Sequence, residues 1–255
     1  MNLSCCIWAL SGPLEEDLDR IAKAGFKWID IRPHTLAADH PGTFGLPVSC
    51  IAVSHGAPEE DILTSPDPAA AARARAYLDG ALEYGAALGA TTAYVVPEAG
   101  GDQDALTRYA DALANAAERA ATLGLKLCIE HFPGSALPTI AATLGFVRAI
   151  GHPNLYLLLD IGHAQMSAED TASAIAAAGP QLGYVHLDDN DGHGDLHLAL
   201  LDGVLTVAAL RRTFEALQTS AYSGAVSLEL HPELPDPLAA LKKSRQILAE
   251  VATIS

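Results

Sequence analysis

The stretch LYLLLDIGH, from Leu155 to His163, begins as an apolar run and reaches an aspartate at its sixth position. Apart from Tyr156, every residue before Asp160 in this stretch is leucine, so we expect its backbone to be buried. A buried carboxylate without a partner is costly. Asp160 therefore either caps the turn that leads toward Ser167 or lies where a negative charge is required.

Seven other short apolar runs resemble this one, and longer alanine-rich segments alternate with them. Runs that are too short for helices and apolar on both sides are typical of parallel strands covered by helices. No linker rich in glycine, serine or proline divides the chain, which predicts one domain over residues 1–255. We expect strands at residues 3–8, 26–31, 48–53, 92–97, 125–131, 155–161, 182–188 and 225–231.

Eight strands that alternate with helices fit either a closed (β/α)₈ barrel or an open doubly wound sheet. The open sheet usually has a glycine-rich turn after its first strand, and ALSGPLEED at residues 9–17 is not such a turn. The α/β barrel is therefore favoured.

Several helix ends carry local signals. Asp67 and Asp236 each precede a proline, which places a capping carboxylate ahead of the first helical position. The sequence SAED at residues 167–170 reads as a capping box that begins another helix. A helix from about residue 103 to 123 is expected to stop at Gly124.

The composition limits which binding partners and which cellular compartment we expect for this protein. The formal net charge of −16 argues against nucleic acid and against an anionic membrane surface. No apolar run reaches the ~18 residues of a membrane span, and no basic segment suggests a secretory signal. The cysteines lie in apolar segments without C-x-x-C spacing, so we expect reduced core thiols in a cytoplasmic protein. They are Cys5, Cys6, Cys50 and Cys128.

Four consecutive predicted strands end in a side chain that can bind a metal ion: Glu130, Asp160, His186 and Glu229. In a barrel the carboxyl ends of all strands meet on one face, and neighbouring strands lie ~4.8 Å apart. A single acid at a strand end is more often a cap, but four such ends in succession favour a metal site. Three carboxylates and one imidazole suit one divalent ion, with Mn²⁺ preferred and Mg²⁺, Co²⁺ or Zn²⁺ as alternatives.

The segment HLDDNDGHGDLHLALLDG, residues 186–203, is unusually rich in aspartate and histidine. Together with His163, its residues Asp195 and His197 offer ligands for a second ion or hydrogen bonds to substrate hydroxyls. Aspartate, asparagine and glycine are also ordinary turn residues. Gly162 is expected to let the chain turn away at the barrel rim.

These motifs resemble those of the xylose isomerase-like barrels, a superfamily of sugar isomerases and epimerases that also contains three-zinc AP endonucleases. The resemblance covers essentially the whole chain, and it is specific for the superfamily but not for a substrate. It rests on GFKWIDIR (25–32), CIEH (128–131), LLLDIGH (157–163), VHLDDNDGHGDLH (185–197) and LEL (228–230).

The resemblance implies roles for individual residues. In the isomerase and epimerase members, the positions that match Glu130, Asp160, His186 and Glu229 bind one divalent ion, and the two glutamates form an acid–base pair. Glu130 and Glu229 would then transfer protons on opposite faces of a bound ketose, and His163 would contact a substrate hydroxyl. Elementary chemistry agrees, because a metal that polarises a carbonyl makes the neighbouring proton accessible to a flanking carboxylate.

Two departures from the family pattern limit what can be transferred. Asp188 stands where relatives often have histidine, and residues 187–205 contain neither the arginine that ketose 3-epimerases use nor any lysine. Arg32 is then the main cationic candidate for a carboxylate or phosphate of the substrate. The alternative for Arg32 is an ion pair at the surface or at the bottom of the barrel.

Other candidates have weaker signals. Trp8 and Phe132 could stack on the apolar face of a sugar or simply pack. His55 is a further candidate for the substrate site, or an extra ligand of a zinc cluster. His131 and His231 directly follow the two glutamates, so strand alternation predicts that they point away from the metal.

We therefore expect a metal-dependent isomerase or epimerase of a small sugar, keto-polyol or keto acid. A dehydratase of an inosose or dehydroshikimate type is the alternative, because it also begins with proton removal beside a ketone. An AP endonuclease-type zinc phosphodiesterase and a non-catalytic barrel subunit are less favoured. The expected partner is a small carbohydrate or keto-polyol, and self-association into a homo-oligomer is left open.

Overall fold

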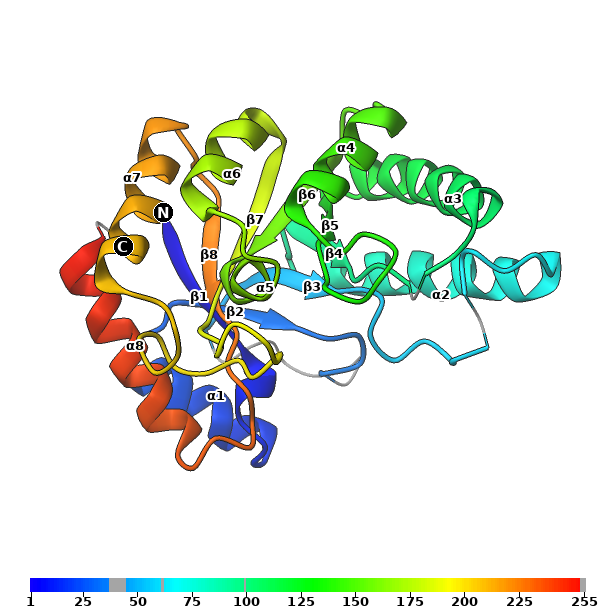
Figure 1. The fold of residues 1–255 in the computed structure, drawn as a ribbon. Helices are drawn as coiled ribbons and strands as arrows, with labels where there is room; N and C mark the ends of the chain where they lie inside the picture. The colour runs from blue at the N-terminus through cyan, green and yellow to red at the C-terminus, as the bar shows by residue number, and fades with distance from the viewer. Residues whose placement is uncertain (37–44, 61, 99, 253–255) are drawn as a thin grey trace.

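The computed structural model describes residues 1–36, 45–60, 62–98 and 100–252. Eight parallel strands follow one another in chain order around a closed barrel, and β1 completes it by pairing with β8 (Figure 1). The predicted (β/α)₈ barrel is confirmed. The strands are β1 (Asn2–Cys6), β2 (Trp28–Ile31), β3 (Val48–Ala52), β4 (Thr92–Val95), β5 (Lys126–Glu130), β6 (Leu155–Asp160), β7 (Leu182–Leu187) and β8 (Ala225–Leu228).

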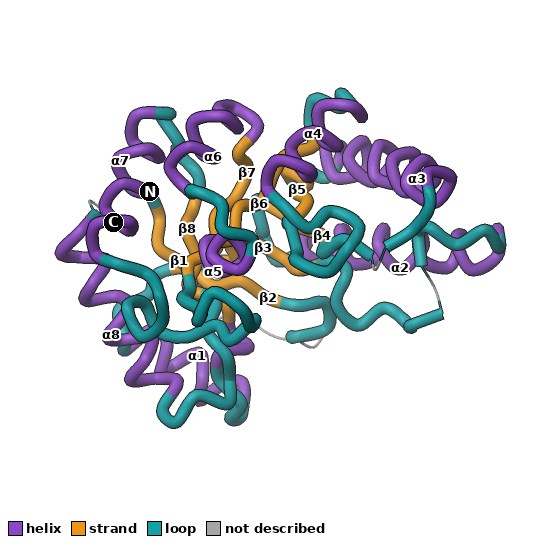
Figure 2. Tube along the Cα trace, in the orientation of Figure 1, coloured by secondary structure: helices purple, strands orange, loops and turns teal. Residues whose placement is uncertain are grey.

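Helices surround the strands on the outside of the barrel (Figure 2). The alanine-rich α2 and α3 pack alanine and leucine side chains against the barrel, which allows the helices to approach it closely. None of the helices in the described part of the chain is long and apolar enough to cross a membrane. The helices are α1 (Leu14–Lys23), α2 (Pro68–Ala87), α3 (Gln103–Thr122), α4 (Ile140–Ile150), α5 (Ile161–Met166), α6 (Thr171–Ala178), α7 (Val207–Thr219) and α8 (Pro237–Val251), with short 3₁₀ turns η1 (Ile7–Ala9) and η2 (Gly179–Gln181).

Two predicted helix starts are confirmed. The carboxylates of Asp67 and Asp236 accept hydrogen bonds from the backbone N–H groups of Ala69 and Ala239, at the beginnings of α2 and α8. The predicted stop after residue 123 is also present, since Gly124 has a φ of 76°.

The capping box predicted at residues 167–170 is wrong. The N-cap of α6 is Asp170, whereas Ser167 closes the preceding helix α5. The carboxylate of Glu169 is committed elsewhere, because it accepts hydrogen bonds from the backbone N–H groups of Ile140 and Ala141 at the start of α4. Asp170, the acidic member of the predicted box, is instead the cap itself, because its side chain accepts the backbone N–H of Ser173 at the start of α6.

Polar and apolar side chains fill the barrel interior together. The hydroxyl of Tyr184 lies 2.8 Å from both Asp30 Oδ1 and Ser49 Oγ, and all three side chains are buried. All four cysteines are buried and unpaired, as expected for core thiols. Asp30 Oδ2 in turn faces His186 Nε2 at 3.8 Å, so this interior network reaches the residues at the strand ends.

Candidate metal centre and adjoining cavity

Four side chains at the carboxyl ends of β5 to β8 converge on one point. Glu130 and Asp160 are the last residues of their strands, His186 is the second-last residue of β7, and Glu229 follows β8 directly. Each offers one ligand atom, these atoms all lie within 4.8 Å of one another, and all four residues are buried. The structure thus brings together the whole set chosen from the sequence.

The imidazole of His186 is at the middle of the set. Its Nδ1 lies 2.7 Å from Glu229 Oε2, 3.3 Å from Glu130 Oε1 and 3.9 Å from Asp160 Oδ2. Three of these buried atoms, Glu130 Oε1, Asp160 Oδ2 and His186 Nδ1, make no hydrogen bond of good angular geometry among the described residues, although they lie close together. Buried polar atoms are almost always satisfied. Unsatisfied carboxylate and imidazole atoms that face a common point therefore fit a divalent cation as its ligands.

The electrostatics of the set lead to the same conclusion. Burial raises the pKa of the Glu130 carboxyl. Burial also opposes ionisation of Glu229, but the neighbouring charge of His186 outweighs it and lowers that pKa. A dication would hold all three carboxylates ionised, and a set of three oxygens and one nitrogen suits Mn²⁺, Mg²⁺, Co²⁺ or Zn²⁺.

Asp160 combines the two roles that the sequence left open. Its Oδ1 accepts a hydrogen bond from the backbone N–H of His163, 2.8 Å away, and so caps α5. Its other oxygen faces His186. His131 supports it from behind, since its Nε2 accepts the backbone N–H of Asp160 at 3.2 Å, and burial lowers the pKa of this imidazole to about 4.

A second polar cluster adjoins the first. His163 Nε2 and His197 Nε2 lie 3.3 and 3.1 Å from the same oxygen of Asp195, and His197 Nδ1 lies 2.8 Å from Asp188 Oδ2. Burial and the charge of Asp160 raise the pKa of Asp188 to about 7. These residues can bind substrate hydroxyls, and the trio of His163, Asp195 and His197 also has the spacing of an ion site.

The expected role of Gly162 as a turn at the rim is wrong. The residue lies inside α5, and a Cβ at this position would be 2.2 Å from Asp188 Oδ1 and 2.6 Å from Asn190 Nδ2. Glycine is needed here because the segment after β7 packs the side chains of Asp188 and Asn190 against α5. The sequence contains no pattern that indicates the contact between Gly162 and Asp188.

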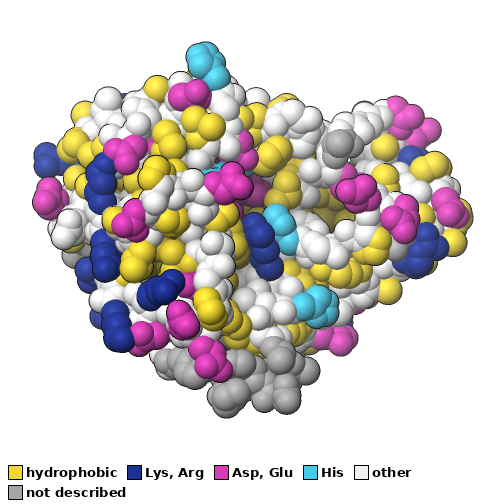
Figure 3. Space-filling model, turned by 90° about the horizontal axis from the view of Figure 1, so that it is seen from below, with side chains coloured by type: hydrophobic (Ala, Val, Ile, Leu, Met, Phe, Trp, Pro, Cys, Tyr) yellow, Lys and Arg dark blue, Asp and Glu magenta, His cyan; other side chains and the backbone are white. Residues whose placement is uncertain are grey.

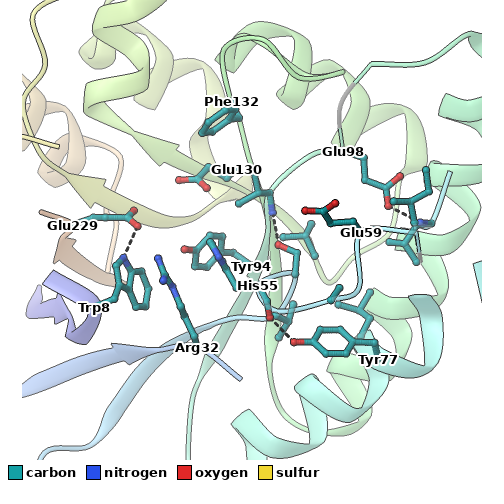
Figure 4. A pocket seen from close by; sticks show the side chains of 18 of the residues that line it. Trp8, Arg32, His55, Glu59, Tyr77, Tyr94, Glu98, Glu130, Phe132 and Glu229 are labelled. Atoms are coloured by element: carbon teal, nitrogen blue, oxygen red, sulfur yellow. Dashed lines mark hydrogen bonds between the residues drawn. The ribbon is translucent and has the colours of Figure 1, made fainter. Parts of the chain in front are cut away.

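The opposite wall of the site comes from the first strands. Trp8 Nε1 donates to Glu229 Oε1 over 3.0 Å, and the guanidinium of Arg32 lies 4.5 Å from the centre of the Trp8 ring (Figure 4). The ring of His55 is 6.3 Å from that of Trp8, and burial together with the charge of Arg32 lowers the His55 pKa. Among the described residues, no group of clustered metal ligands includes His55.

A cavity of about 730 Å³ opens beside these side chains. It appears as a hollow in the molecular surface, at the end of the barrel that is lowest in Figure 1 (Figure 3). Asp160 and His186 lie beneath the lining rather than in it. The predicted residues that line it are Trp8, Arg32, His55, Glu130, Phe132, His163, Asp195, His197 and Glu229.

Sequence reasoning missed the half of the cavity that α2, α3 and the segment after β3 form. Tyr77 and Leu78 come from α2, Tyr109 from α3, and Leu63 from the connection between β3 and α2. His231, expected to point away from the metal, also borders the cavity. Apolar residues at helical spacing read as packing faces, so no signal in the sequence marked them as cavity walls.

Comparisons with known proteins identify relatives of the chain. The chain is 30% identical over 190 residues to L-ribulose 3-epimerase of Mesorhizobium japonicum, a match that covers 70% of this chain and 61% of that protein. It is 27% identical over 166 residues to inosose dehydratase of Yersinia enterocolitica, which covers 58% of this chain and 55% of the relative. Each match thus spans less than two thirds of the relative's length.

A solved structure of an L-ribulose 3-epimerase shares the fold, with a TM-score of 0.81 at 24% identity, over 98% of this chain and 94% of that chain. The sequence pattern of one family matches residues 18–251. Because this match covers nearly all of the barrel, the chain belongs to the xylose isomerase-like TIM barrel family.

Proposed function

We propose that this protein is a divalent-metal-dependent isomerase or epimerase of a small sugar, keto-polyol or keto acid. Glu130, Asp160, His186 and Glu229 would hold one ion, with Mn²⁺ preferred. The observation that carries the proposal is the convergence of these four ligand atoms, three of them buried and unsatisfied, at the rim of a cavity. The similarity to a sugar 3-epimerase supports it.

The chemistry requires a carbonyl that is polarised and a proton that is moved beside it. A bound dication polarises the carbonyl and its neighbouring hydroxyl. Glu130 and Glu229 both border the cavity, so one can remove the proton from the carbon next to the carbonyl and the other can return one. Return to the opposite face of the same carbon gives an epimer, and return to the neighbouring carbon gives an isomer.

Other residues orient the proton-transfer groups and the substrate. The indole N–H of Trp8 fixes Oε1 of Glu229. His163, His197 and Asp195 supply hydrogen-bonding groups for hydroxyls on the side of α5. Arg32 brings a cation to the side of Trp8, where it can bind a carboxylate, a phosphate or a hydroxyl.

A dehydratase is the alternative, and the similarity to inosose dehydratase favours it. It shares the first step, after which a hydroxyl leaves instead of a proton returning. A nucleic-acid substrate is disfavoured by the charge of −16 and by the position of His55, which belongs to none of the ligand clusters found among the described residues. We also propose that residues 1–255 form one domain and that the enzyme is cytoplasmic.

The test combines metal analysis with exchange measurements. Purified protein is assayed for bound metal, then stripped and reloaded with Mn²⁺, Mg²⁺, Co²⁺ or Zn²⁺ before incubation with ketoses and inososes in D₂O. Deuterium at the carbon next to the carbonyl, followed by NMR, indicates proton transfer, and a product lighter by one water indicates the dehydratase.

Glu130→Gln and Glu229→Gln should abolish exchange, while Glu59→Gln, an exposed carboxylate on the same cavity, should not. Retention of metal binding and exchange in both site variants would contradict the proposal. Several zinc ions per chain with cleavage of abasic DNA would favour the phosphodiesterase instead.

A further inference from the structure

The cavity is much larger than a small sugar. A hexose fills about the space of six water molecules, on the order of 180 Å³ at ~30 Å³ each. The cavity measures about 730 Å³. A single sugar at the metal set therefore leaves most of the space empty, and a tight site buries most of its ligand.

The two ends of the cavity differ in chemistry. Glu229, Trp8 and Arg32 lie together at one end, while Tyr77 and Glu98 lie at the other, where β4, α2 and the segment after β3 come together (Figure 4). We define the apolar compartment as the part lined by Leu63, Ala74, Leu78, Val95 and Tyr109. Each of these five residues is less than 9% exposed.

The polar groups near the compartment do not favour the binding of a charged ligand. The carboxylate of Glu98 is already engaged, because it accepts the backbone N–H groups of Leu63 and Thr64 and so holds the wall in place. The Tyr77 hydroxyl donates to the backbone oxygen of His55. The hydroxyl of Tyr109 is buried without a partner in the described part of the chain, and burial raises its pKa, so it is neutral and adds no charge to the compartment.

We propose that the apolar compartment binds a neutral, apolar substituent carried by the substrate, so that the preferred substrate is a substituted keto-sugar or keto-polyol rather than a bare one. Enclosed apolar walls favour such a group by removing its surface from water, about 0.8 kcal/mol for each CH₂, which is roughly a fourfold gain in affinity. This inference extends the proposed function, because the carbonyl end of the same molecule would lie at the metal set.

The first experiment needs neither metal nor turnover. Binding of n-butanol, n-pentanol and n-hexanol to the metal-free protein is measured by ligand-observed NMR. Affinity should rise roughly three- to fourfold with each added methylene. Ala74→Leu, and the milder Ala74→Val, should weaken hexanol binding at least about tenfold and about threefold, because the added carbons occupy the compartment.

The matched control is Ala81→Leu. Ala81 lies on α2, is 4% exposed like the 5% of Ala74, and does not line the cavity. Its substitution overpacks the same helix, so it should lower the melting temperature while leaving hexanol binding intact. Equal loss of binding in both variants, or no chain-length dependence in the parent protein, would overturn the inference.

The second experiment compares turnover of a ketohexose with that of its 6-O-butyl ether. The ether should have the higher kcat/KM, by at least about tenfold; Ala74→Leu should remove this preference, and Ala81→Leu should keep it. Turnover of sugars without preference for the ether would overturn the inference and leave the proposed function standing. If Ala74→Leu blocked alcohol binding but no sugar were turned over, the compartment would bind apolar groups as inferred and the proposed function would be contradicted.

Discussion

The backbone N–H of His163 donates to Oδ1 of Asp160 over 2.8 Å, while the other oxygen of that carboxylate faces Nδ1 of His186 at 3.9 Å. One side chain therefore caps a helix and contributes to the candidate metal set. Asp160→Asn keeps an oxygen for the cap but removes the charge, so the Kd for Mn²⁺ should rise at least about tenfold. Asp160→Ala loses the cap as well and should cost about 1 kcal/mol more stability.

Titration calorimetry and thermal melting separate the two effects. Thr139→Ala is the control, because the Thr139 hydroxyl caps α4 by accepting the backbone N–H of Ala142 and takes no part in the metal set. It should lose about 1 kcal/mol with unchanged Mn²⁺ affinity. Unchanged affinity in Asp160→Asn would show that this carboxylate is only a cap.

Metal should also stabilise the fold. Without a metal, the repulsion among the three buried carboxylates is offset mainly by the charge of His186, and an ion that binds only the folded state shifts the equilibrium toward it. At 100 times its Kd the gain is about 2.7 kcal/mol, which corresponds to a rise of about 5–10 °C in melting temperature for a chain of this size. Chelation should reverse the rise, as followed by differential scanning fluorimetry.

The same measurement on variants identifies the ligands. Glu229→Gln should lose most of the metal-dependent rise, whereas Glu59→Gln should keep it. A full rise in Glu229→Gln would place the ion elsewhere, for example between His163, Asp195 and His197.

Close packing against α5 gives a stability prediction. A methyl group on Gly162 would meet the Asp188 carboxylate at 2.2 Å, and Asp188 is completely buried, so neither side can yield easily. Gly162→Ala should therefore destabilise the protein by about 1–3 kcal/mol, measured by urea unfolding. Gly145→Ala, in the middle of α4 with no atom near the new methyl group, should instead stabilise it by about 0.5–1 kcal/mol. Equal effects at both positions would contradict this explanation.

Local chemistry in the sequence predicted most of the fold. The apolar runs located all eight strands, and the aspartates at 67 and 236 located two helix starts, because each signal acts within a few residues. The capping box at residues 167–170 failed because Ser167 ends α5 and Asp170, the acid of the box, caps α6 itself. The same four residues fit a helix that starts at either Ser167 or Asp170, so the pattern alone does not locate the cap.

The candidate site also has one part that the sequence predicts and one part that it does not. Glu130, Asp160, His186 and Glu229 could be chosen because a barrel places all strand ends on one face. The approach of Asp188 to Gly162 and the walls formed by Ala74 and Tyr109 could not be chosen. They depend on how far the helices and connections stand from the barrel, which apolar spacing alone does not determine.

Trp8 should affect the rate more than binding. Its indole N–H donates to Oε1 of Glu229, so Trp8→Phe keeps an aromatic ring but frees the carboxylate to rotate. We expect kcat on a turned-over ketose to fall about tenfold with little change in KM. Trp28→Phe is the control, since Trp28 begins β2 and does not line the cavity. A rise in KM alone would mean that the indole contacts substrate without orienting Glu229.

Arg32 should affect substrate selection. Its guanidinium lies 4.5 Å from the Trp8 ring centre, its Nε is buried without a hydrogen-bond partner, and it forms no ion pair within the described residues. The ion pair that the sequence analysis considered for Arg32 is therefore absent among the described residues. The guanidinium is available to a ligand. Arg32→Gln should raise KM about tenfold or more for ketoses that carry a carboxylate or phosphate, and less for neutral ketoses.

Arg32→Lys distinguishes charge from geometry. A lysine keeps the charge but loses the flat guanidinium that lies over the indole and binds a carboxylate through two N–H groups. Partial recovery of KM for acidic ketoses would indicate that charge dominates, and no recovery would indicate paired hydrogen bonds. Arg20→Gln, which removes the ion pairs of Arg20 with Glu16 and Asp17 on α1, should leave every KM unchanged. If Arg32→Gln raised the KM of neutral and acidic ketoses equally, Arg32 would bind a hydroxyl that both kinds of substrate share.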